Sequence, residues 1–340
     1  MIFSGKAQSL SRIGVYMKRK LIPSLLALVL GVSAFGACTN SDQKVDFSNY
    51  WNENPLVAEE IHESLVYDVT FKANDTNLVD YKLDYKDGKY TTELTSKVEN
   101  DKLVYTYATT LTITAIYTLG EATQESTDTV TSTVKFYEAG YGLQPISSTK
   151  EINASTPTPA ANGEIDACYQ KSHYTTSVSY NENCTEGKAV VTYYPEGDVE
   201  KVYENTFEIE QKKFSYLDNE QLLLALRAVR NSTSSAKLNV YSPFIETVQK
   251  VSWSFESEAS APFTFTKNDE AINPTITYRV AKMVLDEKNP GATQTVWIAK
   301  KPETSSDKNT HRNLMLRLET PLSYSLGSLV YTLNSVSYNK

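Results

Sequence analysis

The chain has 340 residues, with 33 basic and 41 acidic side chains and a formal net charge of −8 at pH 7. This acidic balance opposes binding to nucleic acids and to anionic lipid head groups, both of which select basic surfaces. Hydrophobic residues make up 40% of the sequence and tyrosine occurs 23 times, a composition typical of β-sheets with one solvated face.

The first residues have the order of a secretory signal. Lys18, Arg19 and Lys20 follow Met17, and an apolar run then covers residues 21–30. This run is too short to span a bilayer at about 1.5 Å per residue. We expect residues 1–37 to form a signal peptide, within which Met17 is the true start because residues 1–16 contain no clear apolar core. The alternative is that the n-region is simply long.

Small residues lead from this run to a cysteine in the order Phe35-Gly36-Ala37-Cys38. The segment from Met17 to Cys38 resembles the lipobox signal of bacterial lipoproteins, although Phe35 replaces the usual Leu or Val. The resemblance implies lipidation of Cys38 and an extracytoplasmic protein anchored in the cell membrane or outer membrane. Two alternatives stay open: ordinary secretion after cleavage at the small residues 32–36, and a retained segment with a buried structural cysteine.

Residues 38–55 are expected to form a polar tether, because Thr39 to Lys44 carry no apolar period. Removal of residues 1–37 takes away five of the 33 basic residues and no acidic one, which leaves 28 against 41 and a net charge of −13. Residues 56–340 then form the folded part, which we expect to be a single antiparallel β domain that is not drawn to the membrane by charge.

Alternating apolar and polar residues predict long strands in the first half of this part. Leu65–Lys72 and Val79–Tyr85 alternate, and Asp87-Gly88 predicts a hairpin turn before Lys89–Val98. A turn at Asn100-Asp101 leads to a Thr-rich strand over 103–119, a break over 120–128 and a strand over 129–137. The Pro-containing stretch 155–163 is expected to be a long surface loop inside one continuous sheet.

Three more strands are expected over 174–180, 189–194 and 199–209, followed by one helix. Asp218 and Gln221 have the spacing of a capping box, and an apolar face runs from Leu222 to Val229. Arg227 and Arg230 favour the C-terminal end. We expect this helix, over about 218–230, to pack on the sheet; the alternative is that it plugs or covers a ligand cavity.

The remaining strands are expected over 238–241, 248–256, 263–266, 275–286, 294–300, 314–318 and 328–338, with a charged loop at 301–309. The order of long strands, a capped Leu-rich helix, the Trp-bearing strand Val296-Trp297-Ile298 and a last strand from Gly327 resembles an uncharacterised bacterial envelope family of single-sheet β-proteins. Those proteins are similar in shape to the lipoprotein-carrier fold. The resemblance implies a mainly β fold, a large curved antiparallel sheet or open half-barrel around one packed helix.

With Cys38 lipidated, Cys168 and Cys184 are the remaining cysteines, and an exported protein can join such a pair in a disulfide. Two thiols in a compartment without oxidant are the alternative. A metal or redox role is weaker, since the sequence has no C-x-x-C and only His173 lies between them.

The sequence predicts no catalytic, metal or cofactor site. His62, His173 and His311 have no metal-ligand spacing, and phosphate-loop, dinucleotide and nucleophile-elbow motifs are absent. Trp253 and Trp297 fit core positions, and Trp51 is the expected exposed aromatic residue. A glycosidase needs two facing carboxylates, and the acidic residues mostly fit turns and outward strand positions.

We therefore expect a non-enzymatic cell-envelope lipoprotein with a binding or scaffolding role, whose partners are the membrane, through the lipid, and an envelope protein or ligand. One alternative is a carrier of an apolar or lipid-like ligand in the concavity of the sheet. A less favoured alternative is an enzyme that acts on envelope glycan.

Overall fold

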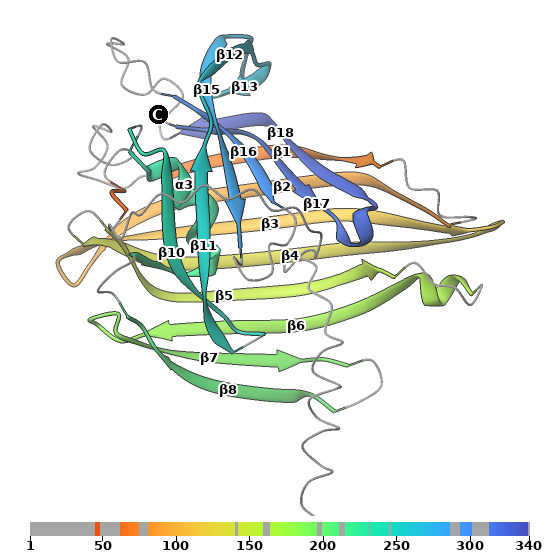
Figure 1. Ribbon diagram of the computed structural model, residues 1–340, viewed down its shortest axis with the longest axis horizontal. Helices are drawn as coiled ribbons and strands as arrows, with labels where there is room; N and C mark the ends of the chain where they lie inside the picture. The colour runs from red at the N-terminus through yellow and green to blue at the C-terminus, as the bar shows by residue number, and fades with distance from the viewer. Residues whose placement is uncertain are drawn as a thin grey trace, which may run out of the picture.

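The structure is a computed structural model that describes residues 45–47, 62–74, 81–139, 142–158, 164–195, 199–210, 215–230, 232–244, 246–285, 293–300 and 313–338. One sheet that contains 18 strands dominates these residues, together with one short α-helix (Figure 1). The predicted mainly β fold is confirmed.

Eight strands form the first part of the sheet, and each is paired antiparallel to the next as in a meander. They are β1 (His62–Ala73), β2 (Tyr81–Glu99), β3 (Lys102–Leu119), β4 (Ala122–Ala139), β5 (Gly142–Pro157), β6 (Tyr169–Tyr180), β7 (Glu186–Tyr193) and β8 (Lys201–Glu208).

The second part contains the helix and ten further strands. They are β9 (Ser215–Leu217), α3 (Leu222–Ala228), β10 (Ser235–Ser242), β11 (Thr247–Phe255), β12 (Ala259–Pro262), β13 (Phe265–Lys267), β14 (Glu270–Ile272), β15 (Thr275–Val284), β16 (Gln294–Ala299), β17 (Met315–Pro321) and β18 (Gly327–Tyr338). Short 3-10 turns occur at η2 (Ile165–Cys168), η3 (Asn219–Gln221) and η4 (Ser323–Ser325).

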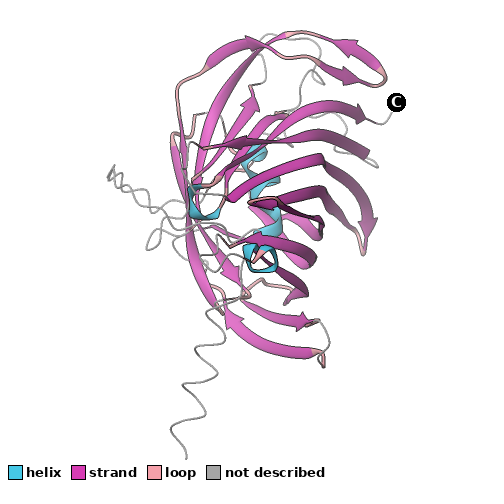
Figure 2. Ribbon diagram, turned by 90° about the vertical axis from the view of Figure 1, so that its right-hand side faces the viewer, coloured by secondary structure: helices cyan, strands magenta, loops and turns pink. Residues whose placement is uncertain are grey.

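The two parts are joined because the first strand, β1, pairs with both β2 and the last strand, β18. From β18 the pairing continues through β17, β16, β15, β11 and β10. The sheet therefore curls over on itself, and α3 lies inside the curl (Figure 2). This is the open half-barrel around a helix that the sequence predicted.

Two pairs of strands are parallel, β9 with β10 and β13 with β18, so the sheet is mixed and not wholly antiparallel as predicted. In the first case the reason is the connection. A hairpin gives antiparallel neighbours, whereas β9 reaches β10 through η3 and α3, which act as a crossover between parallel strands.

The predicted hairpin turn at Asp87-Gly88 is wrong, because both residues lie inside the continuous strand β2. They form a bulge, which shifts the pairing with β3 between Lys86 and Lys89, and Asp87 has a φ of 54°. A Cβ atom on Gly88 would lie 2.3 Å from the carbonyl oxygen of Val69 in β1. The glycine is therefore needed for the close approach of β1 and not for a turn.

Other turns differ from prediction mainly in length. The turn at Asn100 and Asp101 is confirmed, with φ values of 50° and 60°. The break expected over 120–128 is much shorter, because β4 begins at Ala122. Likewise β5 extends to Pro157, into the loop expected at 155–163, whose residues 159–163 lie outside the described part of the chain.

Candidate functional site

A row of buried polar side chains crosses the concave face of the sheet. The pairing places Thr92 of β2 beside Thr109 of β3, then Ser132 of β4, Lys150 of β5 and Thr176 of β6. Four of the five are buried, and Thr109 is half-buried. Because buried polar groups cost free energy unless they are hydrogen-bonded, such a row in a core needs an explanation.

The rows on either side of this polar row are mostly apolar or aromatic. In β3, for example, Tyr107 and Leu111 flank Thr109, and in β4 Val130 and Val134 flank Ser132. The polar row therefore interrupts an otherwise apolar face at one level on five consecutive strands. A mere lapse in the alternation of one strand would not produce this alignment.

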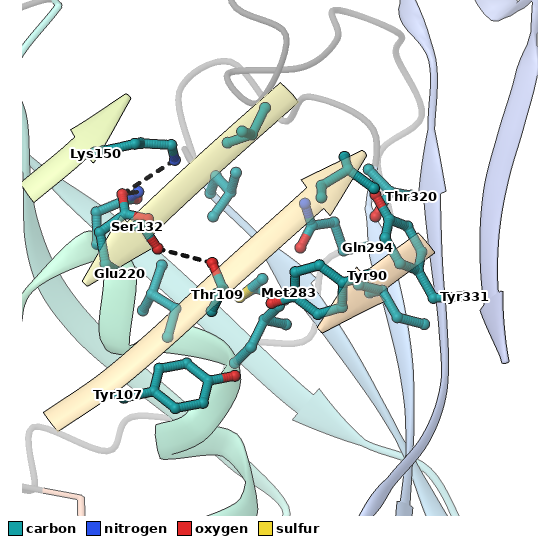
Figure 3. Close-up of a pocket in the computed structure, with 17 residues that line it drawn as sticks. Tyr90, Tyr107, Thr109, Ser132, Lys150, Glu220, Met283, Gln294, Thr320 and Tyr331 are labelled. Atoms are coloured by element: carbon teal, nitrogen blue, oxygen red, sulfur yellow. Dashed lines mark hydrogen bonds and ion pairs between the residues drawn. The ribbon is translucent and has the colours of Figure 1, made fainter. Parts of the chain in front are cut away.

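A cavity of about 90 Å³ lies over the middle of the polar row (Figure 3). Its walls come from the sheet below, from the start of the helix above and from strands β15 to β18 at the side. The lining residues are Tyr90, Tyr107, Thr109, Leu111, Val130, Ser132, Lys150, Asn219, Glu220, Leu222, Leu223, Met283, Leu285, Gln294, Leu318, Thr320 and Tyr331. Asn219 is exposed, so the cavity reaches the molecular surface at the start of the helix.

An ion pair lies at the helix end of the cavity. Lys150 Nζ donates to Glu220 Oε1 at 3.1 Å, and the two side chains are 8% and 13% exposed. Asn219 Nδ2 also donates to Glu220 Oε1, at 2.8 Å. Figure 3 shows both partners of the pair at one end of the cavity, close to the hydroxyls of Thr109 and Ser132, which are hydrogen-bonded at 2.9 Å.

Further polar groups surround the rest of the cavity. Tyr90 and Tyr107 share a hydrogen bond, and burial raises the pKa of both phenols, so both stay protonated at neutral pH. Gln294 and Thr320 contribute an amide and a hydroxyl from β16 and β17. The cavity thus combines hydroxyl, amide and charged groups with apolar side chains such as Met283.

The helix above the cavity begins at a well-bonded cap, as the sequence predicted. Asp218 accepts from the backbone of Glu220 at 2.8 Å, and Gln221 closes the capping box. The second carboxylate oxygen of Asp218, Oδ2, accepts from Ser148 Oγ of β5 and from Tyr180 OH of β6, each at 2.6 Å. Burial, followed by the nearby charge of Glu220, raises the pKa of Asp218.

The other end of the helix is held by two buried arginines. Arg227 donates to both carboxylate oxygens of Glu63 in β1, at 2.7 and 2.9 Å, and its Nε donates to the carbonyl of Asn313 at 3.1 Å. Arg279 of β15 donates to the helix-terminal carbonyl of Val229 at 2.7 Å. With both ends tied to the sheet, the helix is a fixed wall of the cavity, in contrast to a movable cover.

Another buried carboxylate lies further along the concave face. Asp128 of β4 accepts from the backbone and the hydroxyl of Ser155, both at 2.8 Å, and Ser155 contacts Tyr117 OH at 2.8 Å. Burial raises the pKa of Asp128 to about 6. On the side of Ser155 that faces β4, this carboxylate takes the place of backbone pairing, since the pairing of β4 with β5 ends at Thr129 and Asn153.

The structure does not bring Cys168 and Cys184 together, although the sequence predicted a disulfide between them. Cys38 lies outside the described residues. Cys168 directly precedes the 12-residue strand β6, and Cys184 follows its far end. At about 3.3 Å per residue the strand holds the two apart by more than 30 Å, whereas a disulfide needs Cα atoms within about 7 Å. The predicted disulfide between Cys168 and Cys184 is therefore wrong for this structure.

The other aromatic and histidine residues noted in the sequence lie away from the cavity. Trp253 is buried in the core, and Trp297 packs under the guanidinium of Arg317. His173 contacts Glu151 at 3.0 Å on the exposed face. Trp51 and His311 lie outside the described residues.

In the described part of the chain, no cluster of histidine, cysteine and acidic residues has the composition of a metal site. No helix there has the length and apolar character needed to span a bilayer.

Comparison with known proteins gives little further information. No family model and no curated protein matches the chain. Among solved structures, the chain is similar to a β-barrel-like protein of the domain of unknown function DUF1849 from Brucella abortus. The identity is 8%, the alignment covers 82% of this chain and 98% of that protein, and the TM-score is 0.44.

The residues of the cavity were not predicted as a site. A usable signal exists in the sequence: each of the strands β2 to β6 has a polar residue at the same level of the inward face, between mostly apolar neighbours. The signal becomes visible only when the strands are aligned, and the bulge at Gly88 changes that alignment for β2. The role of Arg227 was also missed, because its partner Glu63 lies 164 positions earlier.

Proposed function

We propose that the chain is a cell-envelope lipoprotein, anchored through Cys38, whose folded body binds a small polar molecule without a reaction taking place on it. The observation that carries the binding proposal is the buried polar row beneath the cavity. Since buried hydroxyls and charges are retained only where they find hydrogen-bonding partners, polar groups aligned toward a cavity favour a polar occupant.

The size of the cavity separates this proposal from the lipid-carrier alternative. Pockets for drug-sized molecules have volumes of about 300–1,000 Å³. The 90 Å³ of this cavity corresponds to about three water molecules, at about 30 Å³ each. Most of the concavity is filled by packed side chains of the core. These features support a small ligand and oppose a long acyl chain.

Mass spectrometry tests the binding proposal on the full chain extracted from the membranes of its host in mild detergent. Denaturation of the washed protein is expected to release a small polar molecule. A matched sample of Ser132→Val, which removes one hydroxyl from the cavity floor, is expected to release less. A co-purified lipid in place of a polar molecule, or equal release by the variant, would contradict the proposal.

The anchor is tested separately by Cys38→Ala. If Cys38 carries the lipid, the wild-type chain fractionates with membranes and the variant does not. A variant that still fractionates with membranes after a high-salt wash would contradict the anchor and leave the binding proposal untouched.

A further inference from the structure

The Lys150–Glu220 pair differs from a purely structural ion pair in how much of its hydrogen-bonding capacity is used. Among the described residues, Lys150 Nζ donates only to Glu220 Oε1, although an ammonium group has three donors. Glu220 accepts from Lys150 and Asn219 at the same oxygen, Oε1. Both members of the pair therefore have capacity for further hydrogen bonds on the cavity side.

Burial makes this capacity significant. A buried charge is costly unless its remaining donors and acceptors are also satisfied. The Arg227–Glu63 pair meets that condition through two parallel hydrogen bonds and a third to the carbonyl of Asn313. The Lys150–Glu220 pair, at 8% and 13% exposure, makes a single contact between its members.

The charges at the cavity also restrict the ligand. Lys150 and Glu220 are the charged groups that line it, one of each sign. A ligand with one net charge would be attracted by one of them and repelled by the other. A ligand with a carboxylate and an ammonium group a few ångströms apart can place its carboxylate on Lys150 and its ammonium on Glu220, which gives charge-assisted hydrogen bonds to both.

We infer that the cavity binds a small zwitterion of the amino-acid class, with Lys150 and Glu220 as its charge-recognising residues. This inference rests on the proposed function, because it names the chemistry of the small polar ligand. The hydroxyls of Thr109 and Ser132 and the side chain of Met283 surround the rest of such a molecule. The volume suits a short side chain and excludes a large one.

The test is calorimetric titration of the full chain, in mild detergent, with four small probes. L-Alanine carries both charges, propionate lacks the ammonium group, L-alanine amide lacks the carboxylate, and glycerol is a neutral polyol. The affinity for L-alanine is expected to be higher than that for each of the other three probes by about tenfold or more, because each of those probes lacks at least one charge-assisted hydrogen bond.

Substitutions at Lys150 and Glu220 provide a second test of the inference. Lys150→Met and Glu220→Gln are each expected to weaken L-alanine binding by about tenfold or more. The exchange variant, Lys150→Glu with Glu220→Lys, keeps one charge of each sign and is expected to recover most of the affinity. The matched control is Lys188→Met, which breaks the exposed Lys188–Glu204 pair (2.8 Å) and is expected to leave binding unchanged. Near-ultraviolet circular dichroism checks that each variant is folded.

The outcomes separate the two proposals. If glycerol binds as tightly as L-alanine and Ser132→Val weakens it, the zwitterion inference is overturned and the polar-ligand function stands. If propionate or the amide binds best, the ligand carries a single charge and the inference is again overturned. If none of the four probes binds to the folded wild-type chain, the zwitterion inference is overturned, and the release of a polar molecule in the mass-spectrometric test decides the polar-ligand function separately.

Discussion

The two ends of α3 show two ways of burying charge in one small helix. At the C-terminal end, Arg227 and Glu63 neutralise each other and use their donors and acceptors on protein groups. At the N-terminal end, Asp218 is held by hydroxyls and a backbone amide, and the Lys150–Glu220 pair beside it makes one contact. The first arrangement is typical of a structural clamp, and the second leaves room for a ligand.

The largest effect is expected at the clamp. Arg227→Met leaves Glu63 buried without its cation, and breaking a buried pair in this way costs about 3–5 kcal/mol of unfolding free energy. Urea unfolding of the full chain measures the loss. The double variant Arg227→Met with Glu63→Met is expected to recover most of it, since no charge is then left buried. A double variant as unstable as the single one would show that the two side chains do not act as a pair.

The next largest effect is a pH dependence of the unfolding free energy, which comes from the buried carboxylates of Asp128 and Asp218. The pKa of Asp128 in the folded chain is about 6, above its ordinary 3.8, so the folded state binds the proton more tightly than the unfolded state. Stability from this group therefore rises as the pH falls from about 6 to about 4, by about 3 kcal/mol for two pKa units. Asp218 has a raised pKa and acts in the same direction.

Unfolding free energies between pH 4 and pH 7 check this prediction. Asp128→Asn is expected to flatten the pH dependence, and adding Asp218→Asn is expected to flatten it further. Identical profiles for the wild-type and variant chains would mean that neither carboxylate has a raised pKa.

Loss of the helix cap is expected to have an intermediate effect. Asp218→Ala removes the acceptor of the Glu220 amide and of the hydroxyls of Ser148 and Tyr180, at a cost of about 2 kcal/mol. Asp218→Asn keeps one acceptor oxygen and should cost less. Thermal unfolding compares the two, and equal losses would indicate that the charge, and not the hydrogen bonds, sets the stability of this end.

The smallest loss of stability is expected for the ligand-side pair. Lys150→Met should cost about 1–2 kcal/mol, because Glu220 keeps its bond from Asn219 and lies beside the mouth of the cavity, where water can reach it. A loss as large as that of Arg227→Met would remove the distinction between the two ends and would favour a purely structural role for Lys150.

Local patterns in the sequence were sufficient for most of the elements. Period-two alternation located strands such as Leu65–Lys72, and the spacing of Asp218 and Gln221 located the start of the helix, because both signals depend only on near neighbours. Asp87-Gly88 was misread for the same reason. A glycine required by the approach of Val69 on another strand looks identical in sequence to a glycine required by a turn.

The candidate site depends on distant pairings and could not be predicted in this way. Thr109, Ser132 and Lys150 form a row only through the register of three strands, and Glu220 reaches Lys150 from 70 positions further along the chain. The disulfide failed similarly. The even pair of cysteines left after Cys38 suggested that Cys168 and Cys184 meet, but most of the residues between them form an extended strand.

The pairing of β1 with β18 has a consequence for how the chain acquires its structure. Asp68 and Asn334 are hydrogen-bonded across this pair although 266 positions separate them. One edge of β1 can therefore pair only after the C-terminal strand β18 has been synthesised. Contacts between residues so far apart in the sequence make folding slow. The sheet is therefore completed late in folding. A truncation that removes β18 should leave one edge of β1 unpaired, and an unpaired strand edge promotes aggregation.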